Sequence, residues 1–398
     1  MLRIVVIIGL STLLGLASVA SAQTPFVLDG IGQNVENGTA RDVGRGGWGV
    51  AERDTLNPGS LNPAAAADLR FMQLLFSGAG ERTLDSAPGQ DRVTWRTHLP
   101  FVRLAVPLRS GKLAFHAGFH VKRTFEYESY TLFTVDPFGQ EYQGYETYQR
   151  KGNIIQIPLG LAWRPLEQVA VGAAVNLVRG PVEDRLAQTF DDGPLANDYS
   201  HRLELEGHSV TASVLVSELG PFSLGASVTT GYDLTADRTE KIEAVAGTFT
   251  EQDEVAMPAE YRAGFMVDLG RNWRFGADGA YTAFGDIGEQ TVWPGDLCDE
   301  WTVSAGFERR LARKERGRGY VSPLRFGFQR RHWGYEMNGS PIDETVVSVG
   351  SGVPFRNWRG TIDISLSYAW IGNEADNGVE SQALRLGLSI SGLERLVF

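Results

Sequence analysis

The stretch LAFHAGFHV, residues 113–121, alternates apolar residues with small or polar ones at every second position. Leu113, Phe115 and Val121 would share one face of a strand, because successive side chains of a strand point to opposite sides. The opposite face would carry only alanine, glycine and histidine. A small, mixed face of this kind is typical of a strand that borders a lumen, as in a transmembrane β-barrel.

The same period of two recurs along the chain and predicts an all-β, antiparallel transmembrane β-barrel. An ordinary antiparallel sandwich also alternates, but its water-facing side seldom holds so much glycine and alanine. Tyrosine and tryptophan at predicted strand ends fit the aromatic girdles of a barrel. The fourteen predicted strands lie near residues 69–79, 93–108, 112–125, 149–164, 167–179, 201–218, 222–232, 256–269, 273–284, 300–311, 320–331, 342–354, 360–371 and 381–392.

The connections between these strands alternate in length. Tight turns are expected near 109–111, 165–166, 220–221 and 270–272, and long, acidic loops at 126–148, 180–200, 233–255 and 285–299. Barrels of bacterial outer membranes have an even number of strands, short periplasmic turns and long outer loops. We therefore expect a location in the bacterial outer membrane with both termini in the periplasm. The acidic loops would bind lipopolysaccharide through divalent cations or would simply be solvated.

The first residues predict export. Arg3 precedes an apolar run from Ile4 to Leu16, and Ala20-Ser21-Ala22 follows, which together are typical of a secretory signal peptide. The expected division is a signal peptide at 1–22, an N-terminal hatch or plug segment at 23–68, and the barrel at 69–398. The terminal Phe398 fits recognition by the barrel-assembly machinery, an expected partner during biogenesis. Cys298 is the single cysteine, so no intrachain disulfide is expected.

GRGGWG, residues 44–49, matches the G-x-G-x-x-G pattern of dinucleotide-binding loops. That pattern has meaning only after a buried strand and before a helix, whereas Thr39–Val43 is no buried strand and two Asn-Pro pairs follow. A glycine-rich segment can instead turn sharply and pass close to the wall of a barrel. A fourteen-stranded barrel is too wide to be filled by its own side chains. We therefore interpret the stretch as plug backbone inside the lumen.

The segment ARDVGRGGWGVAERDTLNPGSLNPAAAADL resembles the N-terminal segment of the long-chain fatty-acid outer-membrane transporter (FadL-like) family. Residues 325–370 resemble a branch of that superfamily that includes shuttle barrels of type IX secretion. The resemblance implies a fourteen-stranded barrel closed by an N-terminal hatch, which takes up hydrophobic molecules and passes them on laterally or after a hatch rearrangement. It marks as hatch motif Gly44, Gly46, Gly47, Gly49, Asn62, Pro63 and Ala64; Trp48 departs from the pattern.

Binding an amphipathic ligand needs an apolar groove with a cationic or hydrogen-bonding end. The inward-facing candidates are Arg103, His116, His120, Lys122, Arg262 and Arg274. His116, His120 and Lys122, which share one face of one strand, would either bind a head group or form ion pairs that hold the hatch, because buried charges must be paired. The expected acidic partners are Asp268, Asp278, Glu308 and Asp363. His116 and His120 lack a third metal ligand in the sequence, so no metal is expected.

The function that the sequence predicts is an outer-membrane channel for long-chain fatty acids or other hydrophobic small molecules. The alternative is a non-transporting barrel that acts in secretion or as a scaffold and binds protein partners. A general porin fits less well, because the hatch would close it. No nucleophile motif such as G-x-S-x-G occurs, so we expect neither an enzyme nor a cofactor. Expected partners are a hydrophobic ligand, outer-membrane lipid and lipopolysaccharide, and no nucleic acid.

Overall fold

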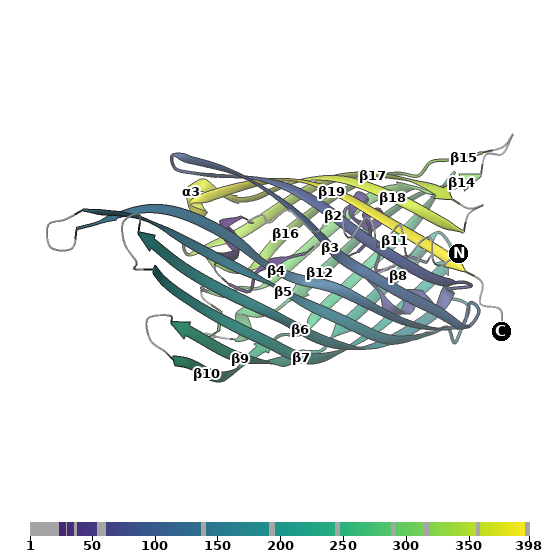
Figure 1. Cartoon of the computed structure of the whole chain (residues 1–398). Helices are drawn as coiled ribbons and strands as arrows, with labels where there is room; N and C mark the ends of the chain where they lie inside the picture. The colour runs from purple at the N-terminus through teal and green to yellow at the C-terminus, as the bar shows by residue number, and fades with distance from the viewer. Residues whose placement is uncertain are drawn as a thin grey trace.

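The computed structural model describes residues 24–28, 30–35, 38–53, 61–136, 141–190, 196–242, 247–287, 292–293, 295–313, 319–355 and 359–394. Its strands form one antiparallel sheet that closes through pairing of the last strand with the first long one, from Glu380↔Ser86 to Glu394↔Met72 (Figure 1). The predicted signal peptide at 1–22 and the terminal Phe398 lie outside the described residues.

The sheet has fourteen strand passes, which confirms the predicted antiparallel barrel. Two passes are each divided by a short break, one into β8 and β9 and the other into β10 and β11. The single strand β7 therefore pairs with β8 at 211–219 and with β9 at 199–207. The passes are β2 (Met72–Ala87), β3 (Gln90–Arg109), β4 (Leu113–Val135), β5 (Tyr142–Trp163), β6 (Val169–Phe190), β7 (Ala196–Leu219), β8 (Phe222–Thr229) with β9 (Tyr232–Ile242), β10 (Gly247–Met257) with β11 (Glu260–Gly270), β12 (Trp273–Thr282), β13 (Glu300–Arg309), β16 (Leu324–Met337), β17 (Ser340–Phe355), β18 (Gly360–Asn373) and β19 (Val379–Glu394).

One side of the barrel is much taller than the other. Strands β4 to β7, β9 and β10 extend beyond the rest of the sheet, at the left of Figure 1. Three of the expected long loops are therefore largely strand: the β4–β5 ladder continues to Val135↔Tyr142, and Tyr130 stacks on Tyr145 with ring centroids 5.3 Å apart. The sequence did not reveal this extension, because a strand outside the membrane needs no apolar outward face. We call this the tall end, and the opposite one the turn end.

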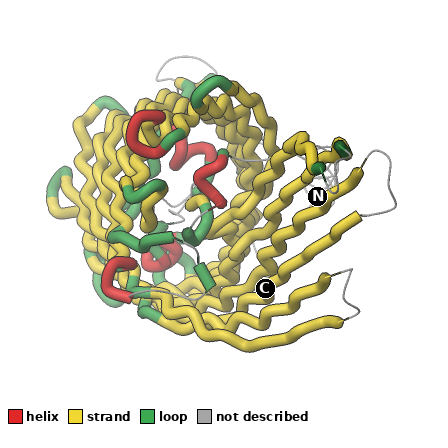
Figure 2. The backbone as a smooth tube through the Cα atoms, turned by 90° about the vertical axis from the view of Figure 1, so that its left-hand side faces the viewer, coloured by secondary structure: helices red, strands yellow, loops and turns green. Residues whose placement is uncertain are grey.

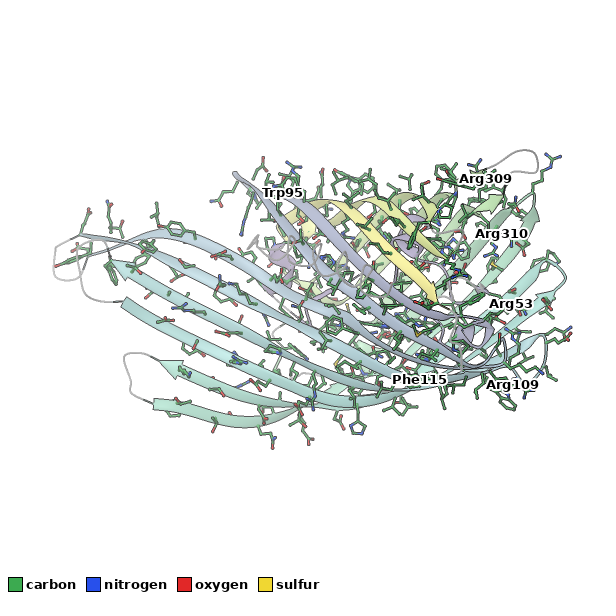
Figure 3. All side chains as sticks on the ribbon, turned by 45° about the vertical axis from the view of Figure 1, so that its right-hand side comes forward. Arg53, Trp95, Arg109, Phe115, Arg309 and Arg310 are labelled. Atoms are coloured by element: carbon green, nitrogen blue, oxygen red, sulfur yellow. The ribbon has the colours of Figure 1, made fainter. Side chains whose placement is uncertain are left out.

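The two faces of the wall differ in composition. Large apolar side chains such as Leu366, Leu386 and Phe328 are exposed on the outside, whereas glycine, serine and charged residues point inward. At the turn end several arginines gather, including Arg53, Arg109, Arg309 and Arg310 (Figure 3). Beside them is a small hairpin, β14 (Ala312–Arg313) with β15 (Tyr320–Val321). Among the described residues no helix is long and apolar enough to cross a membrane.

The N-terminal residues lie inside the ring of strands, where Figure 2 shows helical turns and loops. They form η1 (Pro25–Leu28), β1 (Gln33–Asn34), α2 (Ala40–Gly44) and η2 (Pro63–Asp68). Strand β1 pairs with β4, η2 contacts β4 to β7, and α2 contacts β16 to β19. The barrel proper begins at Met72, three residues after the predicted boundary. The remaining short elements are η4 (Phe284–Ile287) and α3 (Glu374–Asn377).

An apolar cluster fills the lumen toward the tall end. It packs Phe26 and Ile31 of the N-terminal residues against Phe125, Trp333 and Tyr335 of the wall, and Phe26 is fully buried. The Tyr335 hydroxyl donates a hydrogen bond of 3.0 Å to the carbonyl oxygen of Phe26. Burial of a side chain such as Phe26 contributes about 2–3 kcal/mol, so this cluster anchors the first described residues.

Candidate functional site in the lumen

Helix α2 begins with a capping box. The Thr39 hydroxyl accepts a hydrogen bond from the backbone N–H of Asp42, and the Asp42 carboxylate accepts one of 2.9 Å from the backbone N–H of Thr39. Reciprocal bonds of this kind satisfy donors that the first helical turn leaves free. The short helix is therefore fixed at its start, and it directs Arg41 and Arg45 toward the wall.

The GRGGWG stretch follows α2 and runs along a row of wall glycines. Gly46 and Gly47 both have φ of +86°, a conformation that favours glycine. Across the wall, Gly276, Gly306 and Gly327 are direct cross-strand neighbours on β12, β13 and β16. We call these three the glycine row.

Each member of the glycine row is in close contact with the N-terminal segment. A Cβ at Gly327 would lie 1.9 Å from the Gly46 nitrogen, and one at Gly306 would lie 2.3 Å from the Arg45 carbonyl oxygen. At Gly276 the Cβ would be 2.3 Å from the ring of Trp48. Two glycine-rich stretches, far apart in sequence, thus allow backbone-to-backbone packing.

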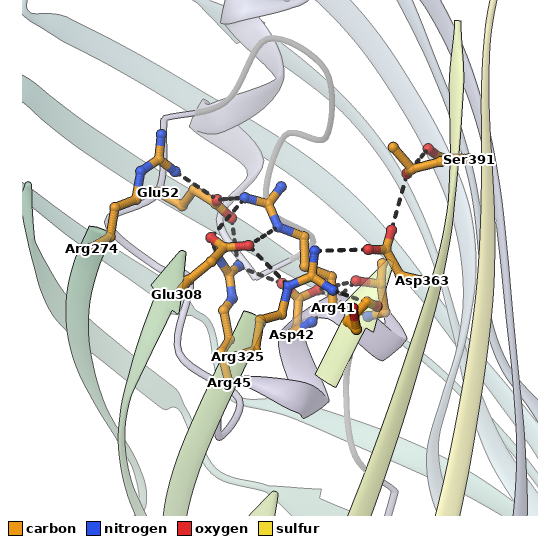
Figure 4. A network of polar contacts seen from close by, with 12 residues as sticks. Arg41, Asp42, Arg45, Glu52, Arg274, Glu308, Arg325, Asp363 and Ser391 are labelled. Atoms are coloured by element: carbon orange, nitrogen blue, oxygen red, sulfur yellow. Dashed lines mark hydrogen bonds and ion pairs between the residues drawn. The ribbon is translucent and has the colours of Figure 1, made fainter. Parts of the chain in front are cut away.

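Eight charged residues join the N-terminal segment to the wall at the turn end, and we call them the ion network (Figure 4). The Glu308 carboxylate accepts bonds from Arg41, Arg45 and Arg325, the first two from the N-terminal segment. Glu52 accepts from Arg41, Arg45 and Arg274. The members are Arg41, Asp42, Arg45, Glu52, Arg274, Glu308, Arg325 and Asp363, four positive and four negative groups.

The balance of charge explains how the network tolerates its burial. Arg45 is fully buried; burial alone would lower its pKa, but Glu52, Asp42 and Glu308 together raise the pKa above its usual value. Arg45 therefore remains charged. Because a buried ion pair gains little over an apolar replacement but costs much when one partner is lost, the network specifies position more than it adds stability.

Two further polar residues fix the segment after the glycines. The Asp278 carboxylate accepts bonds of 2.6 and 2.8 Å from the backbone N–H groups of Gly49 and Val50. The Asn62 amide donates to the carbonyl oxygens of Val50 and Val214, and its oxygen accepts from the Ala64 N–H. The Asn-Pro-Ala motif thus caps η2 and ties the segment to β7.

Asp68, at the end of η2, bonds Arg164 and Arg53 at the turn end. Burial raises the pKa of Asp68, and the two arginines only partly oppose that rise. These two ion pairs fix the end of the N-terminal segment just before the first barrel strand.

Between the apolar cluster and the ion network the lumen holds a cavity with a smaller one beside it, which we call together the chamber. The two cavities share Leu61, Lys122, Gln156, Thr229, Glu260 and Arg262 as lining residues. The N-terminal segment contributes Asn34, Val43, Gly46 and Gly47 to the wall of the larger cavity. The chamber is therefore bounded partly by the barrel and partly by the N-terminal segment.

The structure brings five of the six predicted lumen candidates together at the smaller cavity: Arg103, His116, His120, Lys122 and Arg262. Lys122 and Arg262 both pair with Glu260, an acid that the sequence prediction did not include. His120 packs on Phe101, with ring centroids 4.6 Å apart. Arg274 lies elsewhere, in the ion network.

None of the four acids predicted as partners pairs with Lys122, which bonds Glu260 instead. Glu308, Asp278 and Asp363 contact the N-terminal segment or Arg325 rather than the histidines and Lys122. Asp268 pairs with Arg274 and Arg310. The sequence prediction also missed Arg41, Arg45 and Glu52, although charged residues in a segment assigned to the lumen, such as Arg45 between Gly44 and Gly46, were a usable signal.

No group of three or more histidine, cysteine, aspartate or glutamate side chains is placed to hold a metal ion within the described residues. What the site offers is a chamber with an apolar side and a charged side, closed at the turn end by a segment held with ion pairs.

The fourteen-stranded barrel with N-terminal residues in its lumen is similar in fold to solved FadL-like outer-membrane barrels. A FadL homologue of Pseudomonas aeruginosa matches with a TM-score of 0.64 at 14% identity, over 91% of this chain and 99% of that one. The toluene transporter TbuX of Ralstonia pickettii matches at 0.59 and 14%, over 93% and 100%. The toluene transporter TodX of Pseudomonas putida matches at 0.59 and 14%, over 91% and 99%. These likenesses show the fold.

The chain belongs to the BamG family, whose family model matches residues 1–395. A comparison with the sequences of curated proteins finds no match.

Proposed function

We propose that the protein is an outer-membrane channel for amphipathic hydrophobic molecules such as long-chain fatty acids. The tall end would face the outside, both termini would face the periplasm, and residues 23–68 would act as the hatch. The observation that carries the proposal is the chamber, because it combines the two surfaces that such a ligand needs. The names of the structural relatives, a FadL homologue and two toluene transporters, support the same class of ligand.

The chamber is apolar on one side and cationic on the other. Ile154, Tyr232, Met257 and Phe284 supply the apolar side. Five cationic side chains, Arg103, Lys122, Arg123, Arg262 and Arg331, face three carboxylates, Asp278, Glu260 and Glu300. Arginine and lysine side chains form strong charge-assisted hydrogen bonds with carboxylates. An anionic head group would accept hydrogen bonds from this cationic side while its tail contacts the apolar side.

The hatch role rests on the position of α2. Its Val43 lines the chamber, while Arg41 and Glu308 line a second cavity that opens at the turn end. The N-terminal segment thus separates the chamber from the turn end. Because ion pairs can exchange partners with water and ligand more readily than an apolar core can separate, the ion network suits a part that moves.

Binding of a dansyl-labelled long-chain fatty acid to the purified protein in detergent tests this function. Wild type should bind, and Arg103→Met should bind about tenfold more weakly, the effect of losing one hydrogen bond to a charged group. Arg179→Met is the matched control, because Arg179 is 61% exposed and lies outside the lumen. Absence of binding to wild type, or equal affinity of Arg103→Met and Arg179→Met, contradicts the proposal.

A scaffold that binds protein partners is the second candidate, and the tall wall favours it. This wall carries exposed large apolar residues well beyond the barrel, including Tyr130, Leu132 and Phe249. Mass spectrometry of the protein isolated from native outer membranes in mild detergent distinguishes the two. A stoichiometric fatty acid or hydrocarbon supports transport, whereas a stoichiometric protein with an empty chamber supports the scaffold. Binding to the assembly machinery and to lipopolysaccharide remains a prediction.

A further inference from the structure

The outer wall of the barrel has a shallow, open apolar groove across β7, β8, β11, β12 and β13. Ala226, Ala263 and Gly279 form its floor, and they are direct cross-strand neighbours. Val214 continues the same row on β7 and Val303 continues it on β13. On β18 and β19 the outward positions hold large residues such as Leu366 and Leu386, so the row of small residues makes the groove a local hollow in the membrane-facing wall.

Large side chains border this floor along the tall-end side and, at β8 and β11, along the turn-end side. Toward the tall end lie Tyr261, Tyr281 and Trp301, which are also cross-strand neighbours. Toward the turn end lie Leu224 and Phe265. From Val214 to Val303 the row crosses four strand spacings, or about 19 Å.

A cationic group follows the apolar row. The next residue across from Val303 is Arg330, whose side chain is 41% exposed and contacts Asp343 and Thr345. Beside it, His332 stacks flat on Trp301, with ring centroids 5.7 Å apart. Tryptophan and tyrosine are enriched where a membrane protein meets the head-group region. The groove therefore joins an apolar hollow to a border of aromatic side chains and the half-exposed Arg330–Asp343 ion pair at the membrane surface.

We infer that this groove binds one acyl chain of lipopolysaccharide, with the phosphorylated head group near Arg330. Acyl chains surround this face in any membrane, and the charge of Arg330 complements a phosphate. The aromatic border lies toward the tall end, so in the proposed orientation the occupant belongs to the outer leaflet. The groove lies outside the lumen, and this inference needs neither the chamber nor the hatch.

The test compares lipid content of the protein purified from native outer membranes in mild detergent, with lipopolysaccharide and phospholipid quantified separately by mass spectrometry. Gly279→Leu fills the floor; a Cβ there meets nothing closer than 4.0 Å, so the backbone accepts it. Ala173→Leu is the matched control, because Ala173 is an exposed residue on β6 outside the groove. Heat-dependent mobility in gels confirms that each barrel is folded.

We expect lipopolysaccharide per barrel to fall about tenfold in Gly279→Leu, which corresponds to about 1.4 kcal/mol, and to stay at the wild-type level in Ala173→Leu. Ala226→Leu, which fills the same row from β8, replaces Gly279→Leu if that variant does not fold. Unchanged lipid in both groove variants overturns the inference, as does selective loss of phospholipid or of a bound protein.

Discussion

The two ends of the lumen hold the N-terminal segment by opposite chemistry. Toward the tall end, Phe26 and Ile31 are embedded in aromatic and aliphatic side chains. Toward the turn end, Arg41 and Arg45 are held by Glu308, and their backbone presses against glycine. Apolar side chains that separate become exposed to water without compensation, whereas charged groups that separate regain hydration once water enters. The difference suggests a fixed anchor at one end and a releasable contact at the other.

The largest expected effect is that of Glu308→Ala. It leaves Arg41, Arg45 and Arg325 buried with one carboxylate too few, and loss of one partner from a buried pair typically costs about 3–5 kcal/mol. Urea unfolding of the refolded barrel measures the loss. The control is Glu206→Ala, which removes an exposed partner of Arg179 and should cost less than about 1 kcal/mol. Similar losses in both variants would show that the network contributes no more than surface charges.

Phe26→Ala tests the anchor at the other end. Phe26 is fully buried among aromatic rings, and truncation of such a residue costs about 3 kcal/mol or somewhat more. We expect new protease cleavage near residues 24–35 while the ion network stays protected, and Glu308→Ala should show the reverse pattern. Limited proteolysis with mass mapping checks both. Cleavage at the same sites in the two variants would mean that the segment is held as a single unit.

Gly327→Ala has an intermediate expected effect. The added methyl would meet the Gly46 nitrogen at 1.9 Å, and overpacking of this kind costs about 1–3 kcal/mol. Gly80→Ala is the control, because a Cβ at Gly80 meets nothing closer than 3.9 Å. Thermal unfolding followed by circular dichroism compares the two. Equal melting temperatures would contradict a tight fit between segment and glycine row.

Asn62→Ala has the smallest expected effect. The change removes the cap of η2 and the bonds to Val50 and Val214, for which we expect a loss of about 1 kcal/mol. Asn176→Ala, which removes hydrogen bonds between wall residues only, is the control for side-chain loss in the lumen. Increased proteolysis between residues 50 and 69 only in Asn62→Ala would show that Asn62 holds the N-terminal segment against β7. Identical cleavage patterns in the two variants would contradict this role.

The strand pattern was predictable from sequence wherever the wall crosses a membrane. Residues 113–121 alternate because one face meets lipid, and this region is strand as expected. Glu126 and Glu128 lie on the same strand beyond that region, where the outward face meets no acyl chains. Their polarity therefore predicted a loop, and the height of the tall wall was missed.

The site was predictable in composition but not in pairing. Arg41 and Glu308 are 267 residues apart, and no local pattern connects them. A partial signal was present: Gly276, Gly306 and Gly327 each lie beside an outward phenylalanine, in the sequences FGA, AGF and FGF. Such repeats indicate where a wall is kept free of inward side chains, although they do not identify what fills the space.

The glycine row also has a consequence for the order of events during folding. The N-terminal segment leaves the ribosome first, yet the strands that carry the row, β12, β13 and β16, are among the last to be synthesised. The segment can reach its final position only when these strands have formed, because contacts so distant in sequence form late and slowly. We therefore expect the beginning of the chain to remain unattached to the glycine row until β12, β13 and β16 have paired.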